Sequence, residues 1–220
     1  MLLYLLRHGE SAANAAGIIQ GQQDFPLSDL GRSQAATAGR FLAQLPDLPQ
    51  AILASPLTRA ADTARIIKAI LPEGLPLTFH PALKEMFAGS IEGMTWEAIR
   101  EEHPAFYGRP LEDWLNYTQW GGHSREEFFG IVHTWLDASL LEWKAREIER
   151  VLIVTHAVTL RALIAGLIGQ RQHHQMEYHF GNCTLVRVRV RPADQGERTV
   201  LDALVPIEVQ ASVVGNRSVQ

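Results

Sequence analysis

The sequence predicts an α/β protein whose central sheet is mostly parallel and is covered by helices on both faces. Three short apolar segments support this prediction, at residues 2–6, 51–54 and 151–155, and each is followed by turn residues and then by a helical pattern. Continuous apolar runs are typical of strands buried on both faces, and helical segments between them indicate βαβ connections. The alternation of strands and helices is the pattern of a parallel α/β sheet.

Helix start and stop signals follow the predicted strands in order. Ser28 and Leu57-Thr58 precede helical patterns that end before Pro46 and Pro72. The sequence Ser-Arg-Glu-Glu at 124–127 resembles a capping box and opens a long helix. We therefore expect helices over residues 28–45, 57–70, 95–102, 111–114, 124–144 and 158–168.

The C-terminal part of the chain predicts a strand pair. Residues 184–190 alternate apolar and basic side chains, as a half-exposed strand does, and residues 200–205 can pair with them around a turn at 194–196. Residues 214–220 are expected to form a frayed tail. Residues from about 80 to 125 interrupt the strand–helix pattern, so we interpret them as a small helical cap on a single domain covering residues 1–220.

Composition narrows the function classes. The chain has 220 residues, of which 46% are hydrophobic and 20% are charged, with a net charge of −4. This balance is ordinary for one globular domain and argues against nucleic acid or a membrane surface as a partner. Cys183 is the single cysteine and cannot form an internal disulfide, and the apolar N-terminus is too short for a signal peptide. We therefore expect a cytoplasmic protein.

Basic and imidazole side chains follow all three predicted strands. Arg7 and His8 follow the first strand, Arg59 lies shortly after the second, and His156 follows the third. Ligands of open α/β sheets bind beyond the carboxyl ends of the strands, so these residues can converge on one anion site. Arginine matches the oxygens of phosphate, and histidine can carry a proton or attack as a nucleophile. Residue types alone do not distinguish His8 from His156 as that nucleophile.

Five blocks of sequence, in order, then carry a resemblance to a known family. They are Leu6-Arg-His-Gly-Glu-Ser11 with Asn14; Gln20-Gly21, Asp24 and Pro26-Leu-Ser28 with Gly31 and Gln34-Ala35; Ser55-Pro-Leu-Thr-Arg-Ala60 with Thr63-Ala64; Leu83-Lys-Glu-Met86 with Gly89, Glu92 and Gly93; and Val154-Thr-His156 with Arg161-Ala-Leu163. Together they resemble the histidine phosphatase superfamily, which is phosphoglycerate-mutase-like. The resemblance is to its phosphatase branch, which includes alpha-ribazole phosphatases and broad-specificity phosphatases.

This resemblance implies a role for each matching residue. His8 would be the nucleophile that forms a phosphohistidine, Arg7, Arg59 and His156 would hold the phosphoryl group, and Glu85 would protonate the leaving alcohol. The substrate-binding positions would be Asn14, Gln20, Gly21 and Ala157. A neutral imidazole among cations is a suitable attacker of a phosphomonoester dianion, and the cations neutralise charge as the ester bond stretches. The resemblance implies no metal and no cofactor.

Some assignments have competitors or depart from the family pattern. Glu92 competes with Glu85 as the acid, and we favour Glu85 because of its position in the motif. We interpret Gly9 as a position where a missing side chain lets the backbone approach the ligand. His123 stands where many relatives have glutamate, and Ile131 stands where an arginine often follows, so both departures bear on the substrate.

Three further sequence patterns could indicate a function other than that of a histidine phosphatase. Cys183 and Arg189 have the spacing of a cysteine phosphatase, but the residues between them predict a strand, which cannot wrap a phosphate. A polar loop explains His173, His174 and His179 better than a zinc site, because no ligand-spaced partners accompany them. Walker A and Gly-x-Gly-x-x-Gly patterns are absent from the sequence. Among the aromatic residues of the cap, we hypothesise that Trp114 or Trp120 contributes to specificity.

The sequence thus predicts a metal-independent phosphomonoesterase, of the histidine acid phosphatase type, that acts on a small phosphorylated metabolite. A cofactor-dependent phosphoglycerate mutase is the second hypothesis, which the Glu85-Met-Phe-Ala-Gly89 sequence disfavours because such mutases carry Glu-Arg-x-Tyr-Gly-x-Leu there. A binding module without turnover is the third hypothesis. We also consider a homodimer.

Overall fold

The structure is a computed structural model, and it describes residues 1–107, 115–169, 180–190 and 200–205. Several sequence-based predictions fall outside these ranges. They are the helix at 111–114, the turn at 194–196, the tail at 214–220, and the side chains of Trp114, His173, His174 and His179.

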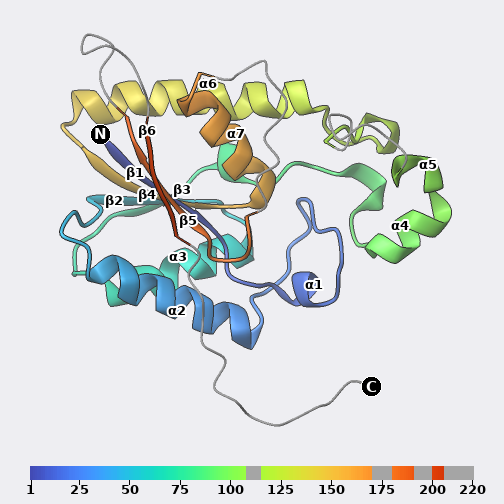
Figure 1. Ribbon diagram of the computed structural model, residues 1–220, viewed down its shortest axis with the longest axis horizontal. Helices are drawn as coiled ribbons and strands as arrows, with labels where there is room; N and C mark the ends of the chain where they lie inside the picture. Colours follow the sequence, from blue (N-terminus) through green and yellow to red (C-terminus); the bar gives the residue numbers. More distant parts are fainter. Residues whose placement is uncertain (108–114, 170–179, 191–199, 206–220) are drawn as a thin grey trace.

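Within the described residues, six strands form one sheet in the order β3-β2-β4-β1-β5-β6 (Figure 1). The strands are β1 (Leu2–Arg7), β2 (Ala51–Ala54), β3 (Leu77–Phe79), β4 (Arg150–Thr155), β5 (Leu185–Arg189) and β6 (Val200–Val205). Strands β3, β2, β4 and β1 run parallel, whereas β5 is antiparallel to β1 and β6 is antiparallel to β5. The predicted mostly parallel sheet and the C-terminal strand pair are therefore confirmed.

Helices cover both faces of the sheet, as predicted. Helices α2 (Asp29–Ala43) and α3 (Thr58–Ile70) lie below the sheet in Figure 1, and α6 (Arg125–Ala145) and α7 (Ala157–Leu167) lie above it. The shorter helices are α1 (Ala12–Ala15), α4 (Trp96–Glu102), α5 (Pro104–Tyr107) and three 3₁₀ turns at Pro81–Leu83, Gly89–Ile91 and Thr118–Trp120. The described residues contain no helix long and apolar enough to cross a membrane.

The central strand β1 is buried on both faces and therefore feeds two hydrophobic cores. Leu3 and Leu5 belong to the core under α6 and α7, while Leu2, Tyr4 and Leu6 belong to the core that includes α2 and α3. This alternation follows from the two-residue period of a strand. It explains why the sequence of β1 is continuously apolar rather than alternating.

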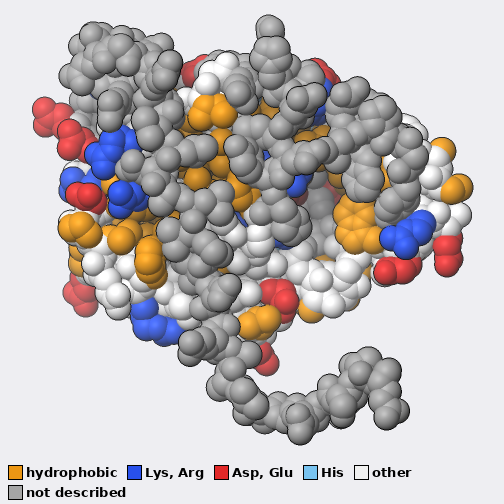
Figure 2. Space-filling model, viewed as in Figure 1, with side chains coloured by type: hydrophobic (Ala, Val, Ile, Leu, Met, Phe, Trp, Pro, Cys, Tyr) orange, Lys and Arg blue, Asp and Glu red, His pale blue; other side chains and the backbone are white. Residues whose placement is uncertain are grey.

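The helices that lie within the described part of the cap (residues 80–125) are all short. Trp120 is the centre of its aromatic packing, with ring centroids 5.4 Å from His103, 5.0 Å from Phe106 and 6.2 Å from Tyr117. Backbone hydrogen bonds tie the cap to the loop after α1, because the Ile19 N–H donates to the Met94 carbonyl over 2.9 Å. On the face shown in Figure 2, the basic side chains of described residues form small groups interspersed with acidic ones.

Candidate active site

The parallel strands bring the predicted nucleophile and the second histidine together. Arg7 is paired with Thr155 across β1 and β4, and the His8 N–H donates to the Thr155 carbonyl over 2.8 Å. The next residues of the two strands, His8 and His156, are almost wholly buried, and their ring centroids are 5.1 Å apart. The structure thus brings these residues together as the parallel topology predicts.

Arg59 is held by hydrogen bonds from three of its nitrogens. It lies in the first turn of α3 and is 1% exposed. Its Nε donates to Nδ1 of His156 over 3.2 Å, and its two terminal nitrogens donate to the carbonyls of Gln23 (2.9 Å) and Gly21 (2.7 Å). Burial lowers the pKa of Arg59 to about 10, with Glu85 the largest opposing influence, so the guanidinium is cationic at neutral pH.

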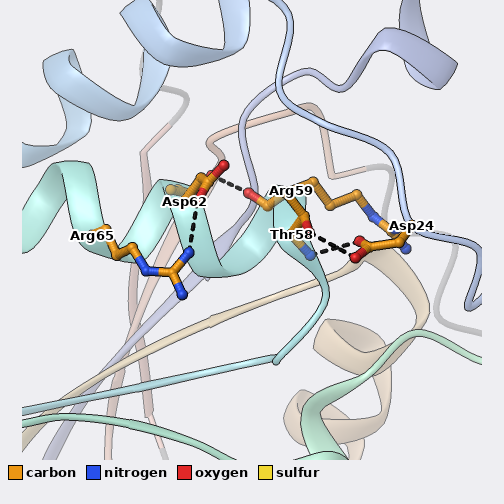
Figure 3. A network of polar contacts seen from close by, with 6 residues as sticks. Asp24, Thr58, Arg59, Asp62 and Arg65 are labelled. Atoms are coloured by element: carbon orange, nitrogen blue, oxygen red, sulfur yellow. Dashed lines mark hydrogen bonds and ion pairs between the residues drawn. The ribbon is translucent and has the colours of Figure 1, made fainter.

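Helix α3 receives its N-terminal cap from a residue far away in sequence. Leu57 precedes the helix and offers no polar side chain, so Asp24 fills that role (Figure 3). Its carboxylate accepts hydrogen bonds from the N–H of Thr58 (2.7 Å) and from the Thr58 hydroxyl (2.6 Å). The cap fixes the start of α3, and with it the backbone of Arg59, against the 17–24 loop.

Hydrogen bonds also fix the tautomer of each histidine. Nδ1 of His8 lies 2.6 Å from the Gly9 carbonyl, which can only accept, so Nδ1 carries the hydrogen and Nε2 keeps its lone pair. In His156, Nδ1 accepts from Arg59, so Nε2 carries the hydrogen that it shares with the Ser55 hydroxyl over 2.7 Å. Each ring is therefore set as a neutral imidazole, and that of His8 has a free basic nitrogen.

The surroundings favour the neutral form of both imidazoles. Burial lowers the pKa of His8 well below 6.5, and the positive charges of Arg7 and Arg59 lower it further. Burial likewise lowers the pKa of His156, with Arg59 as the next cause. A neutral His8 is the form that can attack an electrophile at physiological pH.

The Glu85 carboxylate lies at the N-terminus of α7. Oε2 accepts from the Val158 N–H (3.2 Å), and Oε1 accepts from the N–H and the hydroxyl of Thr159 (both 3.3 Å) and from the Met86 N–H (3.0 Å). The carboxylate also acts on the arginines of the site, because it opposes the burial-induced fall in the pKa of Arg7 and Arg59. Glu85 is therefore placed beside the cationic group.

Glu92, the competing acid, is engaged elsewhere. Its Oε1 accepts from the backbone N–H groups of Gln22 and Ala88, each over 2.9 Å. These bonds join the 17–24 loop to the segment after Glu85. The geometry therefore favours Glu85 over Glu92 as the acid and gives Glu92 a structural role.

Arg7 has one buried hydrogen-bond donor that the described part of the chain leaves unpaired. One terminal nitrogen donates to the Phe180 carbonyl over 2.5 Å, whereas Nε is buried without a hydrogen-bond partner among the described residues. A buried guanidinium N–H without an acceptor is energetically unfavourable, and an anion that accepted its hydrogen bond would remove this penalty. The donor set of arginine and histidine nitrogens suits an oxyanion such as phosphate.

The four predicted substrate-binding residues lie around this centre in different ways. Asn14 and Gln20 are joined through Ser11, whose N–H donates to Asn14 Oδ1 (3.2 Å) and whose hydroxyl donates to Gln20 Oε1 (2.7 Å). Ala157 is the first residue of α7, where a backbone N–H has no acceptor within the helix. Gly21 acts through its carbonyl, which holds Arg59.

Glycines at the site are required by close packing. Gly21 has a φ of +48°, and a Cβ there would overlap the Glu92 carboxylate. That Gly9 lets the backbone approach the ligand stays a prediction, and the structure gives Gly9 a packing role in addition. A Cβ on Gly9 would lie 2.4 Å from the Gly31 carbonyl oxygen, so the missing side chain allows the strand end to meet the start of α2.

Other sequence predictions have clear outcomes. Cys183 is buried, its thiol pKa is raised by burial to about 12, and β5 separates it from Arg189, so rejection of the cysteine phosphatase pattern is confirmed. His123 lies at the cap, where its Nδ1 accepts from the Phe87 N–H over 3.2 Å. The described ranges contain no group of three His, Cys, Asp or Glu residues that could hold a metal ion.

Two residues near the site were missed by the sequence analysis. Asn182 donates to the His8 carbonyl over 3.1 Å, and Tyr117 lies close enough to Glu85 for the carboxylate to add to the burial that raises the phenol pKa to about 12. Tyr117 lies in the cap like Trp114 and Trp120, the two aromatic residues that the sequence analysis singled out. Asn182 precedes a predicted strand whose direction the sequence does not indicate.

The fold is thus α/β, and its parallel strands gather Arg7, His8, Arg59 and His156 at their carboxyl ends, a set of donors that suits an oxyanion. Comparison with protein families agrees, since the model of the histidine phosphatase superfamily (branch 1) matches residues 3–202. The chain belongs to the histidine phosphatase superfamily.

Relatives and solved structures of this family carry several names. The chain is 35% identical over 163 residues to "Metal-independent phosphoserine phosphatase" of Arabidopsis thaliana, a match that covers 73% of this chain and 66% of that protein. It is 31% identical to "Probable phosphoglycerate mutase GpmB" of Salmonella paratyphi C, over 84% and 83% of the two chains.

Two solved structures resemble the fold closely. A mycobacterial glucosyl-3-phosphoglycerate phosphatase in complex with VO3 aligns with a TM-score of 0.76 at 27% identity, covering 92% of this chain and 97% of that one. The alpha-ribazole phosphatase of Shigella flexneri also aligns with a TM-score of 0.76 at 27% identity, covering 98% and 100%. The resemblance to the phosphatase branch is thus confirmed.

Proposed function

We propose that this protein is a metal-independent phosphatase that hydrolyses a small phosphomonoester through a phosphohistidine on His8. The observation that carries the proposal is the state of His8. Its Nδ1–H is bound to the Gly9 carbonyl, its pKa is lowered, and its Nε2 is left with a lone pair beside two arginines. That is the form a nucleophilic histidine needs.

The first half of the reaction forms the phosphoenzyme. Nε2 of His8 attacks phosphorus while the bond from phosphorus to the ester oxygen breaks. Arg7 and Arg59 neutralise the charge of the transferred group. Glu85 acts as the general acid and gives a proton to the departing alcohol oxygen.

The second half returns the enzyme to its starting state. Water attacks the phosphorus of phosphohistidine, Glu85 takes a proton from that water, and the bond from phosphorus to Nε2 breaks. Inorganic phosphate leaves and His8 is again neutral. Glu85 acts as acid in one step and as base in the next, and its hydrogen bonds to the N-terminus of α7 hold the carboxylate in place.

The substrate is proposed as a small phosphorylated metabolite. Relatives are named for phosphoserine and glucosyl-3-phosphoglycerate, which are both phosphomonoesters of modest size. Asn14 and Gln20 are the proposed substrate contacts of the 11–20 loop. Charge neutralisation by arginine, rather than by a resident ion, is the basis for proposing that no metal is needed.

The test is phosphate release from p-nitrophenyl phosphate between pH 5 and 8 in EDTA, with mass spectrometry of the alkali-quenched protein. We expect turnover in EDTA and a protein heavier by one phosphoryl group. The matched variant is His8→Asn, because the asparagine amide can replace Nδ1–H at the Gly9 carbonyl but has no nucleophilic Nε2. Loss of activity in EDTA, or full activity of His8→Asn, contradicts the mechanism.

The mutase hypothesis is tested separately with 2,3-bisphosphoglycerate. A phosphatase releases inorganic phosphate in proportion to the substrate consumed. A mutase returns the phosphoryl group to an acceptor, so phosphoglycerate isomers exchange without net release of phosphate.

A further inference from the structure

A short segment just before β5 holds Arg7, the last residue of β1, and His8, which follows it. The Phe180 carbonyl accepts from the Arg7 guanidinium over 2.5 Å, and the Cys183 N–H donates to the His8 carbonyl over 3.2 Å. Because β5 runs antiparallel to β1, its first residues lie at the same edge of the sheet as the carboxyl end of β1. The segment 180–184 therefore reaches the site from far along the chain.

Asn182 is the side chain of this segment that connects two parts of the site. Its half-buried Nδ2 donates to the His8 carbonyl over 3.1 Å and to Asn14 Oδ1 over 3.2 Å. A primary amide nitrogen has two hydrogens, so both bonds form at once. One group thus fixes the backbone of the proposed nucleophile and the side chain of a proposed substrate contact.

The bonds also determine which way the Asn14 amide faces. Asn14 Oδ1 accepts from both Asn182 Nδ2 and the Ser11 N–H, so the oxygen is turned toward these donors. The two hydrogens of Asn14 Nδ2 are then left to donate away from them. Donors with this orientation suit a phosphate oxygen.

The backbone of this segment is strained, which indicates that its geometry is needed. Cys183 has a φ of +54°, and among the described residues Glu147 is the one other non-glycine with a positive φ. A non-glycine residue in the left-handed region is disfavoured, because its Cβ lies too close to the backbone carbonyl oxygen. Such strain clusters where function requires a particular geometry. Here it allows Asn182 and the Cys183 N–H to reach the same His8 carbonyl.

We propose that Asn182 is a positioning residue that couples the nucleophile His8 to the substrate contact Asn14. The inference rests on the proposed function of His8. In-line attack requires Nε2 and phosphorus to be aligned within a fraction of an ångström. By fixing the His8 carbonyl and Asn14 with one amide, Asn182 sets the distance between attacker and phosphoryl group.

The test uses Asn182→Ala and the isosteric Asn182→Asp, with kcat and KM for p-nitrophenyl phosphate. We expect kcat of Asn182→Ala to fall about 10- to 100-fold, the size of misplacement effects. Asn182→Asp has no donor when ionised, and its protonated carboxyl regains one. We therefore expect its kcat, relative to that of Asn182→Ala, to rise as pH is lowered from 8 to 5.

Coupling is measured with Asn14→Ala and the double variant. If one amide serves both partners, the losses in kcat/KM for Asn14→Ala and Asn182→Ala combine to less than their product. Multiplicative losses overturn the proposal, as does a wild-type kcat in Asn182→Ala.

Gln50→Ala is the control for a merely structural amide. Gln50 Oε1 joins two distant segments by accepting from the N–H groups of Glu149 (2.8 Å) and Arg150 (3.0 Å), at the opposite end of the sheet. We expect it to lower Tm without changing kcat. If loss of kcat follows loss of Tm alike in Gln50→Ala and Asn182→Ala, Asn182 is structural.

The rate of His8 phosphorylation separates this inference from the proposed function. After rapid alkaline quenching, we expect slower labelling in Asn182→Ala than in wild type. Wild-type labelling rates in that variant overturn the positioning role alone. A wild-type protein that turns over without becoming labelled overturns the phosphohistidine mechanism, and with it the inference.

Discussion

The imidazole rings of His8 and His156 lie 5.1 Å apart between centroids and are tilted by 59°, and both are buried with Arg59 beside them. Two imidazoles and two guanidiniums in one buried group cannot all be cationic without a compensating anion. The two histidines are therefore the groups that stay neutral, since burial lowers the pKa of each well below 6.5.

The first prediction is that the unliganded protein loses stability on acidification. Above pH 6.5 both imidazoles are neutral in the folded and unfolded states, so they add no pH dependence. Below pH 6.5 the unfolded chain takes up protons that the folded protein does not. The free energy of unfolding then falls by up to about 1.4 kcal/mol per pH unit for each histidine, until pH reaches the folded-state pKa. Urea denaturation at pH 5 to 8 measures this slope.

His8→Asn isolates the contribution of one imidazole to that slope. We expect the variant to be less sensitive to acid by up to about 1.4 kcal/mol per pH unit. Gln50→Ala, which changes no ionisable group, should shift the whole curve without changing its slope. Parallel curves for wild type and His8→Asn would show that His8 is not held neutral.

The second prediction assigns the acid by its dependence on the leaving group. A nitrophenolate leaves without a proton, whereas an alkoxide needs one. Glu85→Gln should therefore lower kcat for alkyl phosphates by roughly 10²- to 10⁴-fold and lower it far less for p-nitrophenyl phosphate. Phosphate release from serine phosphate and from p-nitrophenyl phosphate, compared in each variant, measures the difference.

Glu92→Gln is the matched control for Glu85→Gln. Glu92 lies seven positions further along the same segment and accepts two backbone N–H groups, so the amide should lower Tm. Its rates with the two kinds of ester should fall by the same factor. A leaving-group dependence in Glu92→Gln but not in Glu85→Gln would reverse the assignment.

The sequence predicts the cationic part of this site because the strand topology determines where most of its residues lie. Once residues 2–6, 51–54 and 151–155 are recognised as parallel buried strands, Arg7, His8 and His156 must lie at one edge of the sheet. Strand β3 was not predicted, since three residues at the sheet edge carry no periodic signal. Glu85 follows from the family resemblance alone, because it lies on an irregular segment.

Asn182 shows why other parts of the site could not be predicted. The alternation at 184–190 predicts a strand, but it does not indicate whether that strand runs with or against its neighbour. Only an antiparallel β5 brings its amino end to the carboxyl end of β1. Gly9 is a similar case, since its need for glycine arises from contact with Gly31, which no local pattern records.

The third prediction concerns that contact between glycines. In Gly9→Ala the new Cβ would meet the Gly31 carbonyl oxygen at 2.4 Å. The position of a Cβ is fixed by its own backbone and the carbonyl is itself backbone, so neither can rotate away. We expect the free energy of unfolding to fall by about 1–3 kcal/mol. Since Gly9 adjoins the proposed nucleophile and its carbonyl accepts from His8 Nδ1, kcat should fall as well.

Gly130→Ala is the opposite case within the same chain. Gly130 lies inside α6, and nothing lies within 4 Å of the position of its Cβ. An alanine there should raise the free energy of unfolding by about 0.5–1 kcal/mol and leave kcat unchanged. Equal effects of the two substitutions on stability would contradict the packing argument.

The last prediction concerns the cap and the choice of substrate. Trp120 packs on His103 and Phe106 and therefore serves the core of the cap, whereas Tyr117 lies near the acid. Burial and Glu85 raise the pKa of Tyr117 to about 12, so its hydroxyl is a hydrogen-bond donor throughout the working range of pH. The turn that carries Tyr117 packs closely against Phe87, two residues after Glu85. A Cβ on Gly122 in this turn would lie 2.6 Å from the Phe87 carbonyl oxygen and 2.7 Å from Tyr117 Cβ.

We expect this hydroxyl to act on the leaving alcohol, because Tyr117 lies near the proposed acid Glu85. Tyr117→Phe should therefore lower kcat/KM about 10-fold, equivalent to one hydrogen bond of about 1.4 kcal/mol, for esters whose alcohol carries polar groups. The rate with p-nitrophenyl phosphate should change less than about twofold, because that leaving group offers no comparable acceptor near phosphorus. Trp120→Leu should instead lower Tm and change all rates alike. If Tyr117→Phe leaves the relative rates of a phosphoester panel unchanged while Trp120→Leu reorders them, specificity is determined by the indole, and Tyr117 only packs.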